Sequence, residues 1–244
     1  MKKVHIVFAY DGSQFLGYQI QNTGRTVQQE LIKAIEKING TKTKIAASGR
    51  TDRGVHAYEQ HACFDTSRDM QEFEWLKALN GLLPKDIYIK KVSFENDDFH
   101  PRFSVKDKTY LYKINMNEYN PFERDYVYQL NKKLDLEKMF HASKYFIGVH
   151  DFRSFCSNEE VDDYSFEREI YDIRFEENNG LLEIYVTGNG FMRYMVRNMV
   201  GTLLEIGLHK KEENIITSRL DVENKDITPF CAPGCGLYLY KVNY

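Results

Sequence analysis

Residues 48–57 hold the densest group of side chains that could do chemistry. Two glycines bracket Arg50, Asp52 and Arg53, so a carboxylate stands between two cations in a short loop. If this loop is locally extended, Arg50 and Asp52 point to the same side, because side chains alternate along an extended chain. A cation within a few ångströms lowers the pKa of an aspartate by about 1 to 3 units, which keeps the carboxylate ionised for work as a nucleophile or base. The same residue types also form ordinary charged surface turns, so the pattern alone leaves both interpretations open.

Residues 188–201 form a second group of this kind. The apolar spacing after a glycine-rich turn predicts a helix over residues 191–206. Six apolar side chains then share one helical face, namely Met192, Met195, Val196, Met199, Val200 and Leu203. Arg193 and Arg197 lie on the margin of that face, about 40° apart. Each arginine either extends into water or pairs with a carboxylate that lines a cleft, and the glycine-framed helix start could bind a phosphate.

Two aromatic groups also have more than one interpretation. Tyr110 and Tyr112 share a face of a predicted strand, where a tyrosine either packs in the core or offers its ring as a stacking surface for a base. Residues 99–104 contain two phenylalanines, one histidine and one arginine, and they suit either a linker or the edge of a nucleic-acid groove.

The sequence gives little support to metal binding, thiol chemistry or a hydrolase triad. The four cysteines, at positions 63, 156, 231 and 235, show neither zinc-ligand spacing nor a disulfide framework. No serine or cysteine nucleophile in a recognised motif accompanies His56, His100 or His150. We therefore expect no metal site.

The elements that must position these residues are interleaved strands and helices, which predicts an α+β protein. Strands are expected over residues 4–10, 44–47, 55–64, 87–94, 110–114 and 182–187, around residue 170, and over residues 236–242. Helices are expected over residues 27–38 after the N-cap Thr26, from about Asp69 to residue 80, over about 135–146, and over 191–206. A boundary near Ser104 divides the chain into halves of residues 1–104 and 105–244.

Composition narrows the function class. The 244-residue chain, 42% hydrophobic and 28% charged, is large enough for a substantial core. It has no run of eighteen uncharged apolar residues and no signal-like first segment, which favours a soluble, cytoplasmic protein without a membrane span. A net charge of −3 argues against unselective coating of nucleic acid. Residues 22–53 nevertheless carry seven cations against three anions, while residues 159–177 carry nine acids against two arginines. This segregation is consistent either with a local cationic surface or with ordinary solvated helix faces.

Taken together, the motifs resemble the tRNA pseudouridine synthase A family almost from end to end. In the N-terminal half they are Tyr10-Asp11-Gly12, Gly17-Tyr18-Gln19, Arg25-Thr26-Val27-Gln28, Gly49-Arg50-Thr51-Asp52, Gly54-Val55-His56-Ala57, Asp98-Phe99-His100 and Arg102-Phe103-Ser104. In the C-terminal half they are Tyr110 with Tyr112, His150-Asp151-Phe152, Ser154-Phe155, Arg168 with Ile170, Gly190-Phe191, Met195-Val196-Arg197-Asn198 and Gly236-Leu237-Tyr238-Leu239.

The resemblance implies a pseudouridine synthase fold, in which two similar α+β halves join in one mostly antiparallel sheet with a central basic cleft. It implies a homodimer without metal or organic cofactor that converts uridine to pseudouridine at positions 38, 39 and 40 of tRNA, in the anticodon stem-loop. By this resemblance the catalytic residues are Asp52 as the catalytic aspartate, Arg197 as its ion-pair partner, and Tyr110 as the aromatic residue that stacks on the target base and can relay a proton. The other substrate-binding residues that we expect are Arg50 for base flipping, Leu237 as an apolar wall, and Arg53, Arg168 and Arg193.

Three features depart from the family pattern. Arg53 replaces the small residue that commonly follows the aspartate, the acidic residues 159–169 are unsuited to facing phosphate, and residues 209–233 are a short, poorly matched stretch. A relative that modifies another RNA site is the nearest competing function. A non-catalytic RNA-binding or folding-assistance module is the competing class.

Overall fold

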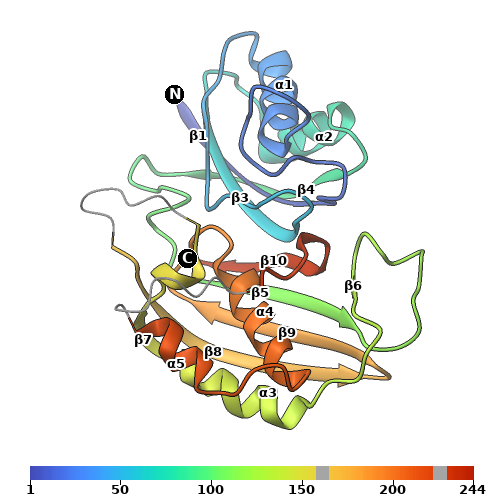
Figure 1. The fold of residues 1–244 in the computed structure, drawn as a ribbon. Coiled ribbons are helices and arrows are strands. Elements are labelled where there is room, and N and C mark those ends of the chain that lie inside the picture. Colours follow the sequence, from blue (N-terminus) through green and yellow to red (C-terminus); the bar gives the residue numbers. More distant parts are fainter. Residues whose placement is uncertain (158–164, 222–229) are drawn as a thin grey trace. The chain divides into compact units, whose positions relative to one another are not determined.

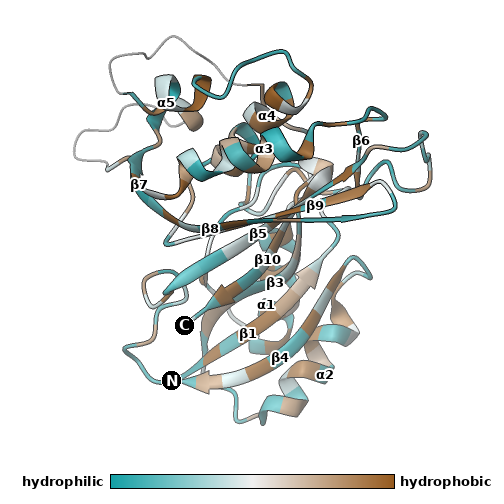
Figure 2. Ribbon diagram, turned by 90° about the horizontal axis from the view of Figure 1, so that it is seen from below, coloured by the Kyte–Doolittle hydropathy of each residue, from teal (hydrophilic) through white to brown (hydrophobic). Residues whose placement is uncertain are grey.

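A computed structural model describes residues 1–157, 165–221 and 230–244 of the chain. The chain forms two compact units, one of residues 1–106 with 238–244 and one of residues 107–237. Both units combine a sheet with helices, which confirms the predicted α+β class (Figure 1). In Figure 2 the hydrophobic segments concentrate in the strands, whereas most connecting loops are hydrophilic. No helix of the described residues is long and apolar enough to cross a membrane.

A mostly antiparallel sheet forms the first unit. Strand β1 (Lys2–Tyr10) lies between β3 (His56–Thr66) and β4 (Ile87–Glu95) and pairs with both in antiparallel fashion. The short β2 (Ile45–Ala47) pairs with one end of β3, and β10 (Leu237–Asn243) pairs in parallel with its other end, where Tyr238 lies opposite His56. This pairing with β3 is why residues 238–244 belong to the first unit, although the sequence-based boundary near Ser104 assigns them to the second half.

The first helix of this unit begins and ends where the sequence predicts. Helix α1 (Val27–Asn39) follows Thr26, whose side chain accepts a hydrogen bond from the Gln29 amide, and Gly40 closes it with a bond to the Glu36 carbonyl. Such caps satisfy backbone groups that have no partner within the helix. The buried face of the helix comprises Val27, Leu31, Ala34 and Ile35.

The predicted start of the second helix near Asp69 is wrong. Helix α2 (Glu72–Leu82) is capped by Gln71, whose amide donates to the Glu74 carboxylate over 2.7 Å, while Asp69 pairs with Lys2 instead. The predicted end is also early. The helix continues through Gly81 to Leu82, and the Asn80 side chain exchanges two hydrogen bonds, of 2.8 and 2.9 Å, with the backbone of Ile89 on β4.

The sheet of the second unit is antiparallel in the order β5, β9, β8, β7. These strands are β5 (Asp107–Asn115), β9 (Leu181–Gly188), β8 (Glu167–Asn178) and β7 (Gly148–Asp151), and the two-residue β6 (Tyr128–Gln129) joins β5 in parallel. The helices are α3 (Leu136–Ser143), α4 (Met195–Gly207) and α5 (Ile215–Leu220), with 3₁₀ turns at Lys144–Phe146, Arg153–Phe155 and Gly234–Gly236. Helices α3 and α4 contact each other (Figure 1). The sequence predicts neither β6, β7 nor α5.

Helix α4 differs from its prediction in one respect that affects the site. It starts at Met195 rather than residue 191, because Tyr194 has a left-handed backbone with φ of 64°. Arg193 therefore lies outside the helix, and the glycine turn does not frame the helix start. The apolar face within the helix is confirmed, since Met195, Val196, Met199, Val200 and Leu203 are all buried.

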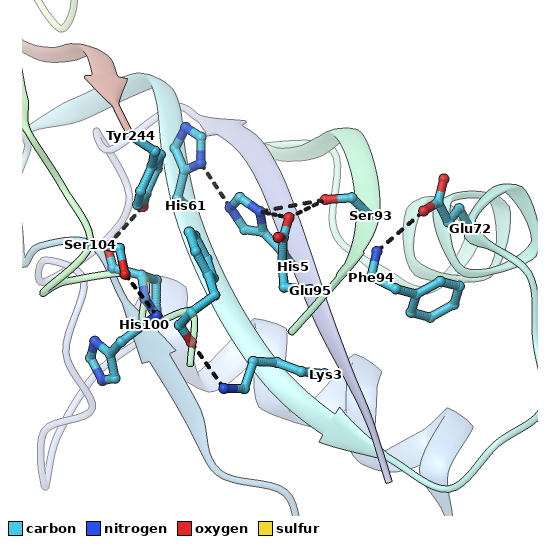
Figure 3. Close-up of polar contacts among 12 residues, drawn as sticks. Lys3, His5, His61, Glu72, Ser93, Phe94, Glu95, His100, Ser104 and Tyr244 are labelled. Atoms are coloured by element: carbon cyan, nitrogen blue, oxygen red, sulfur yellow. Dashed lines mark hydrogen bonds and ion pairs between the residues drawn. The ribbon is translucent and has the colours of Figure 1, made fainter. Parts of the chain in front are cut away.

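A buried pair of histidines lies in the first unit (Figure 3). The Nε2 of His5 is 2.9 Å from the Nδ1 of His61, and the Nδ1 of His5 is 3.1 Å from a Glu95 carboxylate oxygen. The Nε2 of His61 is 3.4 Å from Glu59. Two neutral imidazoles have two N–H hydrogens for these three contacts, so one of the three contacts has no hydrogen.

We expect this pair to make the unfolding free energy depend on pH. Burial is the main cause that lowers the pKa of each histidine below 6.5, with Lys91 contributing and the glutamates opposing. Unfolded histidines protonate near pH 6.5, so the unfolded state binds more protons below that pH and the folded state loses stability as the pH falls. The loss approaches about 1.4 kcal/mol per pH unit for each extra proton.

Urea unfolding of the wild type and of His61→Gln between pH 7.5 and 5 measures this effect. The slope of stability against pH is expected to be smaller in His61→Gln. His209→Asn is a matched control, because His209 is exposed and its φ of 56° suits asparagine. Equal slopes in the wild type and His61→Gln would show that the pair does not titrate in this window.

Candidate active site

In the first unit, the loop of residues 48–55, here called the Asp52 loop, connects β2 to β3. Arg50 and Arg53 are exposed and Asp52 is half-buried, while Thr51 between them is buried. The Val55 amide bonds to the Asp52 carbonyl over 3.2 Å, and Gly54 supplies the positive φ of 73° in this turn. The loop thus presents a carboxylate flanked by two solvent-facing cations.

Residues 10–18 contact the Asp52 loop and hold it in place. The Tyr18 amide donates to the Thr51 carbonyl over 3.0 Å, and the Gly12 amide donates to the His56 ring over 3.0 Å. The backbones approach so closely that a Cβ on Gly12 would meet the Val55 carbonyl oxygen at 2.0 Å. These contacts give the motif around Gly12 and Gly17 a local physical role, which is to hold the loop in one conformation.

Gly17→Ala is expected to destabilise the protein more than Gly54→Ala. Both positions have positive φ, which costs an alanine about 1 to 2 kcal/mol. A Cβ at Gly17 would also meet the Thr51 carbonyl oxygen at 2.8 Å, whereas a Cβ at Gly54 meets nothing within 4 Å. Such crowding typically adds about 1 to 3 kcal/mol. Chemical denaturation of the two variants measures the difference, and equal losses would show that the close approach is relieved at no cost.

In the second unit, Arg197 lies in the first turn of α4. Its Nε donates to the Ala232 carbonyl over 2.7 Å, and the Ala232 amide donates back to the Arg197 carbonyl over 3.1 Å. The guanidinium carbon lies 4.9 Å from the centre of the Tyr194 ring, and that of Arg193 lies 4.8 Å from the same ring. Tyr194 therefore brings the two arginines together, although Arg193 is not on the helix.

The sequence does not predict a role for Tyr194. The signal that the sequence holds for it is its position between the two arginines, one residue after Arg193 and three before Arg197. Its left-handed backbone lets the ring contact both cations, and cation–π contacts of this kind hold a guanidinium in a defined place.

The remaining predicted residues of the second unit occupy different elements. Tyr110, on β5, is 8% exposed and meets the Phe191 ring edge to face at 5.1 Å between ring centres. Leu237, at the start of β10, is 5% exposed. Arg168, on β8, is half-buried and donates to the Ser165 carbonyl over 2.9 Å. Tyr112 is a core residue, because it is fully buried and its hydroxyl donates to the Pro233 carbonyl.

The acids of the predicted acidic run from Glu167 onward all lie on β8, and residues 158–164 of that run lie outside the described residues. Over the described ranges, no group of three or more histidine, cysteine or acidic side chains could hold a metal ion.

Comparison with known proteins decides the family. The sequence profile described as tRNA pseudouridine synthase matches residues 6–104 and 142–244. The chain belongs to the tRNA pseudouridine synthase family. The predicted pseudouridine synthase fold is thereby confirmed, as an α+β protein with mostly antiparallel strands in each unit.

Family members of known name match over nearly the whole chain. A protein of Staphylococcus saprophyticus named tRNA pseudouridine synthase A is 42% identical over 98% of this chain and 90% of its own length. The Bacillus cereus protein named tRNA pseudouridine synthase A 1 is 42% identical over 100% of this chain and 99% of its own length. A Geobacillus protein named tRNA pseudouridine synthase A is 44% identical over 100% of this chain and 98% of its own length.

Similarity to solved structures is lower. The crystal structure of an archaeal box H/ACA sRNP Nop10-Cbf5 complex aligns over 83% of this chain and 43% of that chain, with 13% identity and a TM-score of 0.38.

Proposed function

We propose that this family member isomerises uridine to pseudouridine at positions 38, 39 and 40 in the anticodon stem-loop of tRNA. The full-length similarity to proteins named tRNA pseudouridine synthase A carries this proposal. The reaction breaks the bond from C1′ to N1 of uracil, turns the base, and joins C1′ to C5. The C5 proton is lost and N1 gains one, so the reaction is balanced without an oxidant or reductant.

Asp52 is the catalytic carboxylate in this proposal, and Arg197 is its ion-pair partner. An ionised carboxylate near the sugar can either attack C1′ or remove a sugar proton, and both routes need the charge that a nearby guanidinium stabilises. Two observations support this role: Asp52 is half-buried, and backbone hydrogen bonds hold its loop in one conformation. The bonds that Arg197 makes with Ala232, and its contact with Tyr194, support a fixed guanidinium.

Tyr110 and Leu237 form the apolar part of the proposed pocket. Taking the target base out of its stack costs a few kcal/mol, and stacking on one aromatic ring returns about 1 to 3. The edge contact with Phe191 limits how the Tyr110 ring can turn, which supports its use as a stacking surface. An apolar wall at Leu237 helps to keep water from the intermediate.

In this proposal, contacts between arginines and the RNA supply the rest of the free energy that base flipping requires. We propose that Arg50 acts in base flipping and that Arg53, Arg168 and Arg193 contact RNA phosphates. The exposure of Arg50, Arg53 and Arg193 supports contact with a large anionic partner. We further propose a homodimer that acts in the cytoplasm, and sedimentation of the purified protein tests the dimer.

Mapping pseudouridine in tRNA from cells that lack this protein tests the function. Carbodiimide-blocked primer extension is expected to show loss of the modification at positions 38–40 and its return when the gene is restored. Loss at another position would identify the alternative enzyme. Unchanged modification, with tRNA binding by the purified protein, would indicate the RNA-binding or folding module.

A further inference from the structure

A buried polar layer lies under the Asp52 loop in the first unit. It comprises Tyr10 at the end of β1, Ser48 and Thr51 in the loop, and Gln60 on β3. All four side chains are at least nine-tenths buried, and Ser48 and Gln60 are fully so. Hydrogen bonds within such a layer are costly to lose, because a buried polar group left without a partner cannot turn to water.

The amide of Gln60 has a single possible orientation. The His61 amide donates to its Oε1 over 3.1 Å, and its Nε2 donates to the Gly49 carbonyl over 3.1 Å. A backbone N–H only donates and a carbonyl only accepts, so these two partners settle which atom is oxygen. The Ser48 hydroxyl gives Oε1 its second hydrogen bond, over 2.6 Å.

This orientation leaves Gln60 one further amide hydrogen, and Tyr10 links Gln60 to Thr51. Gln60 is hydrogen-bonded to the Tyr10 side chain, and only its second amide hydrogen is left to make that bond. The Tyr10 hydroxyl is also hydrogen-bonded to the Thr51 hydroxyl, 2.8 Å away, and either oxygen can be the donor. Burial raises the pKa of Tyr10 to about 12, so the phenol keeps its hydrogen at neutral pH.

We propose that Gln60, acting through Tyr10 and Thr51, is the residue that positions Asp52 for catalysis. Gln60 holds Gly49 directly and Thr51 through Tyr10, so it holds the residues on both sides of Arg50 and the residue next to Asp52. The inference rests on the proposed role of Asp52. Gln60 and Tyr10 are positioning residues, because they act on the loop and not on the substrate.

Tyr10→Phe tests the inference, since it removes one hydroxyl and keeps the ring. We expect kcat for pseudouridine formation to fall about 10- to 100-fold, because a misplacement on the order of 1 Å has effects of this size. KM for tRNA is expected to change less than about twofold, because the substitution weakens binding of the transition state and not binding of the substrate. Thr51→Val is expected to behave in the same way, and Thr51→Ser, which keeps the hydroxyl, to retain wild-type kcat.

Thr66→Val is the matched control for loss of a buried hydroxyl. Thr66 is 2% exposed at the far end of β3, and its hydroxyl donates to Asn39 over 2.7 Å. This variant is expected to lower the melting temperature while kcat stays at the wild-type value. If Tyr10→Phe does not fold, the comparison of Thr51→Val with Thr51→Ser tests the same bond.

A double variant separates the proposed chain from two independent effects. If Tyr10 acts through Thr51, then Tyr10→Phe with Thr51→Val has about the same kcat as either single variant. Wild-type kcat in Tyr10→Phe, or fully multiplied losses in the double variant, would overturn the positioning role. Inactivity of the wild type on tRNA would instead overturn the proposed function, so the two failures are distinguishable.

Discussion

We expect the replacement of Asp52 with asparagine to leave tRNA binding intact and to abolish pseudouridine formation. The amide has almost the shape of the carboxylate, so the loop bonds that involve the Asp52 carbonyl and the Thr51 carbonyl are kept. It has no negative charge with which to attack C1′ or remove a sugar proton. We expect a loss of kcat of at least about 10⁴-fold, the size seen when a central catalytic group is removed. Single-turnover assays with purified tRNA measure the rate, and filter binding measures the affinity.

Asp65→Asn is the matched control for this charge change. Asp65 is an exposed acid on β3, and its substitution alters the net charge of the first unit in the same way. It is expected to leave turnover unchanged. If Asp52→Asn also keeps its turnover, the catalytic assignment is wrong.

We expect the replacement of Arg197 with methionine to lower kcat about 100- to 1,000-fold, with little loss of tRNA affinity. Methionine retains the apolar stem, but it lacks the positive charge that we propose stabilises the Asp52 carboxylate. Removal of one electrostatic partner from an active site commonly costs this much. Steady-state kinetics with the same tRNA separates kcat from KM.

Arg174→Met controls for loss of an arginine from the same unit. The Arg174 guanidinium lies 4.3 Å from the Tyr185 ring and pairs with Glu176 over 2.9 Å, so it also has an aromatic contact. It is expected to have nearly wild-type kcat. Equal losses of rate and affinity in Arg197→Met would indicate that Arg197 binds RNA and does not assist the aspartate.

Local signals made parts of the fold predictable. Thr26 and Gly40 end α1 through bonds to residues three or four positions away, and such short-range pairs are visible in a sequence. The start of α4 was not predictable in this way, because residues 191–194 fit the apolar period of the helix. Only the left-handed Tyr194 excludes them, and an aromatic residue gives no warning of that conformation.

The candidate site was predictable only as a set of motifs. The sequence contains the Asp52 loop and the Arg197 helix, but the contacts that support them join distant residues. Gln60 lies fifty positions from Tyr10, and Ala232 lies thirty-five positions from Arg197. No periodicity or cap signal links such pairs. The pairing of β10 with β3 was not predictable either, because it also joins distant residues, although β10 itself was predicted as a strand.

The parallel pairing of β10 with β3 has a consequence for biosynthesis. The ribosome makes β3 well before β10, and the whole of the second unit is translated between them. At about 5 to 20 residues per second, translation of residues 107–237 takes about 7 to 26 seconds, and the first unit must wait that long for its missing strand. During that interval the stretch of β3 beside the Asp52 loop has unpaired backbone groups, and premature termination would leave them permanently exposed to association with other chains.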